Sequence, residues 1–158
     1  PIRRVDLQKA IMIAIGRTKA AAGGGIRAEP REIQQQVPLN ILLAEDSPDS
    51  AVPISLHLQQ LGFQVVMAND GEEAVKVATL SRPDLILMDL AMPVLDGLAA
   101  TKIIREESPS PYIPIIAITA FSTSGFLQAA HDVGFDGYLT KPIDFDRMDD
   151  LIKTLLRI

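Results

Sequence analysis

Residues 84–97 read DLILMDLAMPVLDG, and this stretch decides the fold. The apolar run Leu85–Met88 is too short for a buried helix and is typical of a strand that is covered on both faces. Asp89 follows directly. Because burial of a carboxylate is costly, we expect this residue at the open carboxyl end of the strand. The Met-Pro and Asp-Gly pairs then force a turn. The stretch therefore predicts a single acid held at the edge of a rigid parallel sheet.

Further apolar and amphipathic segments alternate on either side of this strand. The expected strands are 39–44, 63–68, 85–88, 113–119 and 137–140. The expected helices are 48–61, 71–81, 97–106, 122–133 and 145–156. Such alternation predicts an α/β fold, with helices on both faces of a parallel sheet. Right-handed crossovers favour a flavodoxin-like, doubly wound sheet with strand order 2-1-3-4-5.

The first helix carries one irregular residue. Pro53 removes a hydrogen bond within the helix, so the helix is expected either to start late or to kink there. Its apolar face is predicted to hold the aliphatic residues Ile54, Leu56, Leu58 and Leu61.

The predicted strand order brings polar residues to one edge of the sheet. Glu45 and Asp46 end the first strand, Asp89 the third, Thr119 the fourth and Lys141 the fifth. Ligands of such sheets bind outside the carboxyl ends of the strands, where the strand order reverses. Each residue alone fits an ordinary strand-end or solvated position. Their joint placement favours a functional site.

Three carboxylates in one pocket repel one another unless a cation joins them. With oxygen ligands alone, the fitting ion is Mg2+, with Mn2+ as the alternative. A carboxylate such as Asp89 beside a metal and a lysine can act as a nucleophile toward a phosphoryl group. Lys141 and the metal would neutralise the transferring oxygens, and Thr119 could donate a hydrogen bond.

Composition excludes several classes of protein. The net charge of −5 disfavours direct nucleic-acid binding, since no cationic surface attracts phosphates. With zero cysteines, disulfides and thiolate metal sites are excluded, which suits the cytoplasm. No apolar run approaches the roughly 20 residues that span a bilayer, so we expect no membrane segment in this chain.

Residues 39–158 resemble the receiver domains of two-component signalling, the response-regulator family. The motifs that carry the resemblance are ILLAED at 41–46, MDLAMPVLDG at 88–97, IAITA at 116–120 and YLTKPI at 138–143. All occur in the family's order, over about 120 residues. The resemblance implies that the domain is a phosphoacceptor and not an enzyme beyond its own phosphoryl transfer.

The resemblance also implies roles for individual residues. Asp89 would accept the phosphoryl group from a histidine kinase or a histidine phosphotransfer domain. Mg2+ would be held by Asp46, Asp89 and the backbone carbonyl of Ala91, with Glu45 acting through water. Lys141 would pair with the phosphoryl group, and the Lys141-Pro142 bond would be cis.

The family's conformational switch maps onto two further positions. Phosphorylation would draw Thr119 inward, and Tyr138 would follow into the space left behind, which is a shift between two existing states. The alternative for Tyr138 is an edge-strand aromatic that packs on the fourth helix.

The chain departs from the family where Glu45-Asp46 stands in place of the commoner Asp-Asp pair. The longer Glu is similar to receivers fused to hybrid histidine kinases. Two other functions stay open. One is a Mg2+-dependent aspartyl-phosphate phosphatase or phosphotransferase of the haloacid-dehalogenase kind, which needs a second Asp where Ala91 stands. The other is a receiver-like interaction module that is never phosphorylated.

The N-terminal segment carries a stripe that is repeated near the C-terminus. Pro1-Ile2 and the apolar residues 7, 10, 11, 14 and 15 match Pro142-Ile143 and residues 148, 151, 152, 155 and 156, at a constant offset. We therefore expect 1–17 to be an amphipathic helix left from a preceding receiver domain, as in a hybrid kinase or tandem-receiver protein. Residues 18–38 would be a linker, and 39–158 the receiver domain. The exposed stripe could pair two molecules into a homodimer.

Overall fold

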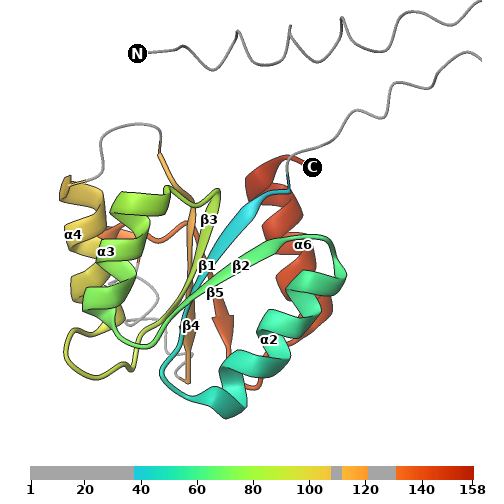
Figure 1. Cartoon of the computed structure of the whole chain (residues 1–158), viewed down its shortest axis with the longest axis horizontal. Helices are drawn as coiled ribbons and strands as arrows, with labels where there is room; N and C mark the ends of the chain where they lie inside the picture. The colour runs from blue at the N-terminus through green and yellow to red at the C-terminus, as the bar shows by residue number, and fades with distance from the viewer. Residues whose placement is uncertain (1–37, 108–111, 121–130) are drawn as a thin grey trace, which may run out of the picture. The chain divides into compact units, whose positions relative to one another are not determined.

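The computed structural model describes residues 38–107, 112–120 and 131–158. In this part of the chain, five parallel strands form one sheet in the order β2-β1-β3-β4-β5. The strands are β1 (Asn40–Ala44), β2 (Gln64–Ala68), β3 (Leu85–Asp89), β4 (Ile115–Thr119) and β5 (Gly137–Thr140). The predicted α/β class, the flavodoxin-like architecture and the strand order are therefore confirmed (Figure 1).

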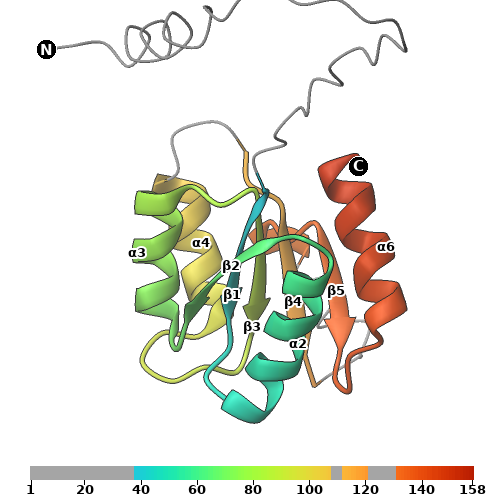
Figure 2. The same ribbon diagram turned by 45° about the vertical axis from the view of Figure 1, so that its right-hand side comes forward.

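Helices cover both faces of the sheet. They are α2 (Pro48–Gln60), α3 (Gly71–Ser81), α4 (Gly97–Glu107) and α6 (Phe145–Leu156). Figures 1 and 2 show α3 and α4 on one face, and α2 and α6 on the other. The expected helix 122–133 falls almost entirely outside the described residues. So do the expected helix 1–17, its role in a homodimer and nearly all of the linker 18–38. None of the helices in the described ranges is long and apolar enough to cross a membrane.

The core consists of two apolar layers separated by the sheet. Residues of β1, β3 and β4 alternate between the layers, and most of their side chains are fully buried. One layer includes Ala74 and Ala78 of α3, and the other includes Met148 and Ile152 of α6. Each fully buried large aliphatic side chain stabilises the fold by about 1.5–3 kcal/mol relative to exposure. This burial makes the central strands a rigid base for the loops at their ends.

Two of the four residues predicted for the apolar face of α2 are buried, and the other two are not. Ile54 and Leu58 are buried as expected, but Leu56 is 54% exposed and Leu61 is 44% exposed. Successive helical residues are about 100° apart, so Leu56 lies about 200° from both Ile54 and Leu58. The buried stripe is instead completed by two small residues, Ala51 and Ser55. The helix begins at Pro48 and runs through Pro53, so of the two alternatives the late start is excluded.

The loop after Asp89 is held between α3 and α4 by two close approaches. A Cβ atom on Gly97 would lie 2.1 Å from the carbonyl oxygen of Asp89, and one on Gly71 would lie 2.1 Å from that of Leu95. Within the loop, Leu95 N–H donates to Pro93 O at 2.7 Å across Val94, whose φ is +66°. A β-branched residue rarely adopts this conformation, and here it stands inside a three-residue turn closed by that hydrogen bond.

A polar cluster closes the opposite end of the sheet. Arg105 of α4 donates to the carbonyl oxygens of Ile113 and Gly134 and to the carboxylate of Asp136. Its guanidinium also lies 4.0 Å from the centre of the Tyr112 ring. Asp136 in turn accepts from Tyr112 Oη and from Ile115 N–H. The pKa of Tyr112 is raised, mainly by burial and then by its hydrogen bond to Asp136.

Gly97→Ala tests the close approach behind Asp89. Helix propensity alone would make this change stabilising by about 0.5–1 kcal/mol. We expect the opposite, a loss of about 2–3 kcal/mol in the free energy of unfolding, because the new methyl group collides with backbone. Urea denaturation measures it. As a control on the same helix, Ala99→Gly should cost no more than about 1 kcal/mol. A Gly97→Ala variant as stable as wild type would contradict the packing.

Arg105→Ala tests the polar cluster. The change removes several hydrogen bonds and leaves Asp136 without its cation, so we expect the free energy of unfolding to fall by about 2–3 kcal/mol. The matched control is Lys102→Ala, an exposed cation on the same helix, which should change stability by less than about 0.5 kcal/mol. Equal losses in the free energy of unfolding for the two substitutions, measured by urea denaturation, would show that the polar cluster does not stabilise the fold.

Candidate functional site

Neighbouring strands carry the predicted site residues to one edge of the sheet. The parallel register pairs Ala44 of β1 with Met88 of β3, so Glu45 and Asp89 are the next residues on adjacent strands. Thr119 pairs with Thr140 at the end of β4 and β5, and Lys141 follows. The convergence expected from strand order is therefore present.

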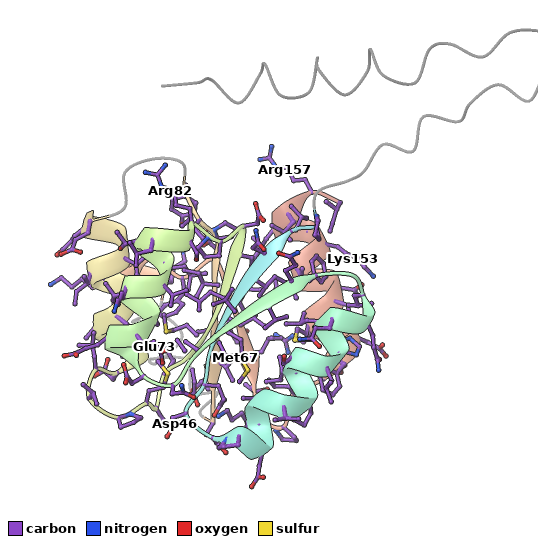
Figure 3. The ribbon with its side chains drawn as sticks, viewed as in Figure 1. Asp46, Met67, Glu73, Arg82, Lys153 and Arg157 are labelled. Carbon is purple, nitrogen blue, oxygen red and sulfur yellow. The ribbon has the colours of Figure 1, made fainter. Side chains whose placement is uncertain are left out.

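Three carboxylates gather at this edge. Glu45, Asp46 and Asp89 each offer an oxygen, and these oxygens lie within 4.8 Å of one another. Glu45 and Asp89 are buried, whereas Asp46 is exposed. Figure 3 shows Asp46 at the end of the domain opposite Arg82 and Arg157. An all-oxygen donor set of this charge suits Mg2+, the ion expected from the sequence.

Lys141 lies between two of these acids. Its Nζ is 2.6 Å from Asp89 Oδ2 and 2.8 Å from Glu45 Oε2. Asp89 ends β3, as expected, but it is only 2% exposed there. The ammonium makes that burial tolerable, since paired charges lose far less on leaving water than isolated ones.

The Lys141 ammonium and the Glu45 carboxylate form a close ion pair. Among the described residues, Glu45 Oε2 has no hydrogen-bond partner, although the atom is fully buried. The other oxygen, Oε1, accepts from Ser47 N–H at 3.3 Å. A buried carboxylate oxygen needs a cation close by, and here the Lys141 ammonium, 2.8 Å away, supplies that charge.

Burial and pairing shift two ionisable groups of the site. Burial raises the pKa of Glu45, and the nearby Lys141 only partly opposes this. Burial alone would lower the pKa of Lys141, but the hydrogen bond to Asp89 and the contact with Glu45 outweigh it, so this pKa is raised. Lys141 therefore stays charged at neutral pH.

Backbone groups orient the remaining parts of the site. Ala91 N–H donates to Asp89 Oδ1 at 3.0 Å, so both oxygens of that carboxylate are engaged. Lys141 N–H donates to the carbonyl of Thr119 at 2.8 Å, which joins the ends of β4 and β5. The side chain of Thr119 is buried. The Lys141-Pro142 peptide bond is cis, as the resemblance implied.

Tyr138 lies on the edge strand β5 and is 36% exposed. The guanidinium of Arg147, from α6, lies 5.3 Å from the centre of its ring. An outward position of the ring fits the expected switch, but coupling between Tyr138 and Thr119 stays a prediction.

Sequence reasoning missed two features of the site. It expected Glu45 to contact only a water bound to the metal, whereas in the structure the Glu45 carboxylate lies beside the Lys141 ammonium. The available signal was the extra methylene group of Glu relative to Asp, which lets the carboxylate reach farther, toward Lys141. It also missed a groove of about 280 Å³ beside Lys141, lined by residues of α2, of the loop before α6 and of the start of α6. The lining residues are Asp49, Ser50, Pro53, Ile54, Lys141, Pro142, Ile143 and Phe145.

The sequence of this chain is similar to those of known proteins. The family model of the response regulator receiver domain matches residues 41–153. The polar-differentiation response regulator DivK of Brucella anthropi is 32% identical over 120 residues, which are 76% of this chain and 98% of that protein. Hybrid signal transduction histidine kinase I of Dictyostelium discoideum is 35% identical over 144 residues. That match covers 87% of this chain and 8% of the kinase.

A solved structure agrees with the sequence matches. It is the receiver domain of the sensor histidine kinase PA1611 from Pseudomonas aeruginosa PAO1, with a magnesium ion coordinated in its active site cleft. It is 36% identical to this chain, with a TM-score of 0.71, and the match covers 77% of this chain and 99% of that one. The chain belongs to the response regulator receiver domain family of two-component signalling.

Proposed function

We propose that this domain accepts a phosphoryl group on Asp89 from a phosphohistidine, with Mg2+ bound beside it. One observation carries the proposal. The Asp89 carboxylate is held at the end of β3 between the Lys141 ammonium and the Ala91 N–H, next to two further acids. A nucleophile held in one orientation beside a cation is what in-line transfer requires.

In the transfer step, a carboxylate oxygen of Asp89 forms a bond to phosphorus as the phosphorus–nitrogen bond of the donor breaks. The electron pair of that bond stays on the imidazole nitrogen, which gains a proton from solvent. Lys141 is already 2.6 Å from the carboxylate and can pair with the oxygens of the arriving group. We assign Thr119, at the end of β4, to a hydrogen bond with the same group.

The residues of the cluster are suited to hold the metal. We assign Asp46, Asp89 and the carbonyl of Ala91 as ligands, with Glu45 reaching the ion only through water. When bound, Mg2+ neutralises charge on the transferring oxygens. Mn2+ suits the same donors. We further propose that occupation of the site shifts Thr119 and Tyr138 together as the output switch.

The surface beside the site suits a helical partner, which we take to be a histidine kinase or histidine phosphotransfer domain. The outward face of α2 exposes Val52, Pro53 and Leu56, of which Val52 and Leu56 are each more than half exposed. The groove beside Lys141 lies next to them. Exposed apolar side chains next to a reactive group mark an interaction surface. The similarity to receivers of histidine kinases supports a hybrid-kinase or tandem-receiver parent, with 39–158 as its receiver.

The competing functions lack support in the residues present. An aspartyl phosphatase of the haloacid-dehalogenase kind needs a carboxylate where Ala91 has a methyl group. A module that never takes phosphate would not need the Lys141 ammonium 2.6 Å from the buried carboxylate of Asp89. A cytoplasmic location stays a prediction from the sequence.

Asp89→Asn tests the phosphoacceptor. Incubation of wild type with acetyl phosphate and Mg2+ should add one phosphoryl group by intact mass, and chelation of the metal with EDTA should abolish the addition. Asp89→Asn should show no addition, because an amide is not a nucleophile of this kind. The control is Asp96→Asn, an exposed acid in the same loop, which should label like wild type. Undiminished labelling of Asp89→Asn would overturn the assignment.

A double substitution, Val52→Ser with Leu56→Ser, tests the docking surface. Transfer from a phosphorylated histidine phosphotransfer protein that labels wild type should slow by about tenfold or more, as apolar contact is lost. Labelling by acetyl phosphate should not change, because that donor needs no docking. Leu80→Ser, a 76% exposed position on α3, is the matched control. Equal transfer rates for the double variant and wild type would place docking elsewhere.

A further inference from the structure

Glu45 makes contacts that a role in metal binding alone does not explain. Its side chain is completely buried, and its Oε2 lies 2.8 Å from Lys141 Nζ. The side chain of Asp46, the next residue, is exposed at the cluster. The two acids at the end of β1 therefore face different surroundings, one against the ammonium and one toward solvent.

The base of the Glu45 side chain is held by backbone contacts. Glu45 N–H donates to Ala68 O at 3.1 Å, which joins the end of β1 to β2. Oε1 accepts from Ser47 N–H, so the carboxylate is also tied to the start of α2. A carboxylate held at both ends has little freedom to swing away from its cation. Glu45 is thus a fixed counter-charge for Lys141.

The two partners of Lys141 differ in what phosphorylation does to them. Transfer to Asp89 converts its carboxylate into an acyl phosphate, so the oxygen that now pairs with the ammonium no longer carries its full charge. Glu45 is not changed by the reaction. The lysine stem is flexible, and Glu45 gives its ammonium an anchor that stays unchanged while the Asp89 carboxylate reacts and the phosphoryl oxygens arrive.

We propose that Glu45 is a positioning residue that holds the Lys141 ammonium at the phosphorylation site before and after transfer to Asp89. Its direct contact is with Lys141, and its contact with the metal runs only through water. The inference rests on the proposed function, and it deepens the role of the same site. The length of the side chain matters, because Asp would withdraw the carboxylate by one carbon–carbon bond, about 1.5 Å.

The first experiment examines the ion pair alone. It uses the metal-free, unphosphorylated protein at constant pH and follows the Lys141 ammonium by ¹⁵N NMR. In wild type we expect a resolved Nζ signal whose protons exchange slowly with water. Glu45→Gln and Glu45→Asp should both speed this exchange by about tenfold or more, the size of losing one charge-assisted contact. Glu72→Gln, an exposed acid on α3, is the control and should leave the signal unchanged.

The second experiment separates positioning from metal binding. In calorimetric titrations with Mg2+, Glu45→Gln and Glu45→Asp should bind within about threefold of wild type, whereas Asp46→Asn should lose about tenfold or more. At saturating Mg2+, labelling of Glu45→Gln by acetyl phosphate should be about tenfold slower. A purely structural role would lower thermal stability without moving the Lys141 signal.

Two outcomes overturn the inference. One is an Nζ signal that does not change in Glu45→Gln. The other is a loss of Mg2+ affinity in Glu45→Gln as large as in Asp46→Asn, which would make Glu45 part of the metal site. Neither depends on phosphate. A failure of the proposed function, seen as labelling of Asp89→Asn, is therefore distinguished from a failure of the role given to Glu45.

Discussion

The ammonium of Lys141 is the contact on which the functional end of the sheet depends. It neutralises two buried carboxylates that follow neighbouring strands, Glu45 at 2.8 Å and Asp89 at 2.6 Å. Without a cation these two acids, both buried, would repel each other. The backbone N–H of Lys141 also joins β5 to the carbonyl of Thr119. Charge pairing and sheet hydrogen bonding thus position the same residue.

The loop that follows Asp89 gives this charge cluster a fixed frame. Gly71 and Gly97 allow α3 and α4 to approach its backbone more closely than any side chain permits. Val94 is held in a left-handed conformation at the tip of the loop. Strained backbone persists where surrounding packing determines it, and it gathers near functional sites. The carboxylate of Asp89 is therefore presented by rigid parts of the fold, which favours a reaction that depends on positioning.

Much of the fold could be predicted because its signals are local. Apolar runs bounded by turn residues indicated every strand of the sheet, and the strands fell within about two residues of their predicted ends. The buried face of α2 was harder to predict. Leu56 and Leu58 look alike in the sequence, yet they point about 200° apart on the helix, and Ala51 and Ser55 complete the buried stripe. Which stripe turns inward depends on how closely the helix packs on the sheet.

The sequence by itself determined the fold class, the strand order and the gathering of Asp46, Asp89, Thr119 and Lys141 at one edge. It could do so because parallel strands with right-handed crossovers leave few arrangements. The tertiary structure alone decided how the charges pair. Glu45 and Lys141 are 96 positions apart in the chain, and no local pattern relates them. Their contact depends on side-chain length, on the rotation of each strand end and on burial, which exist only once the sheet and its helices have packed.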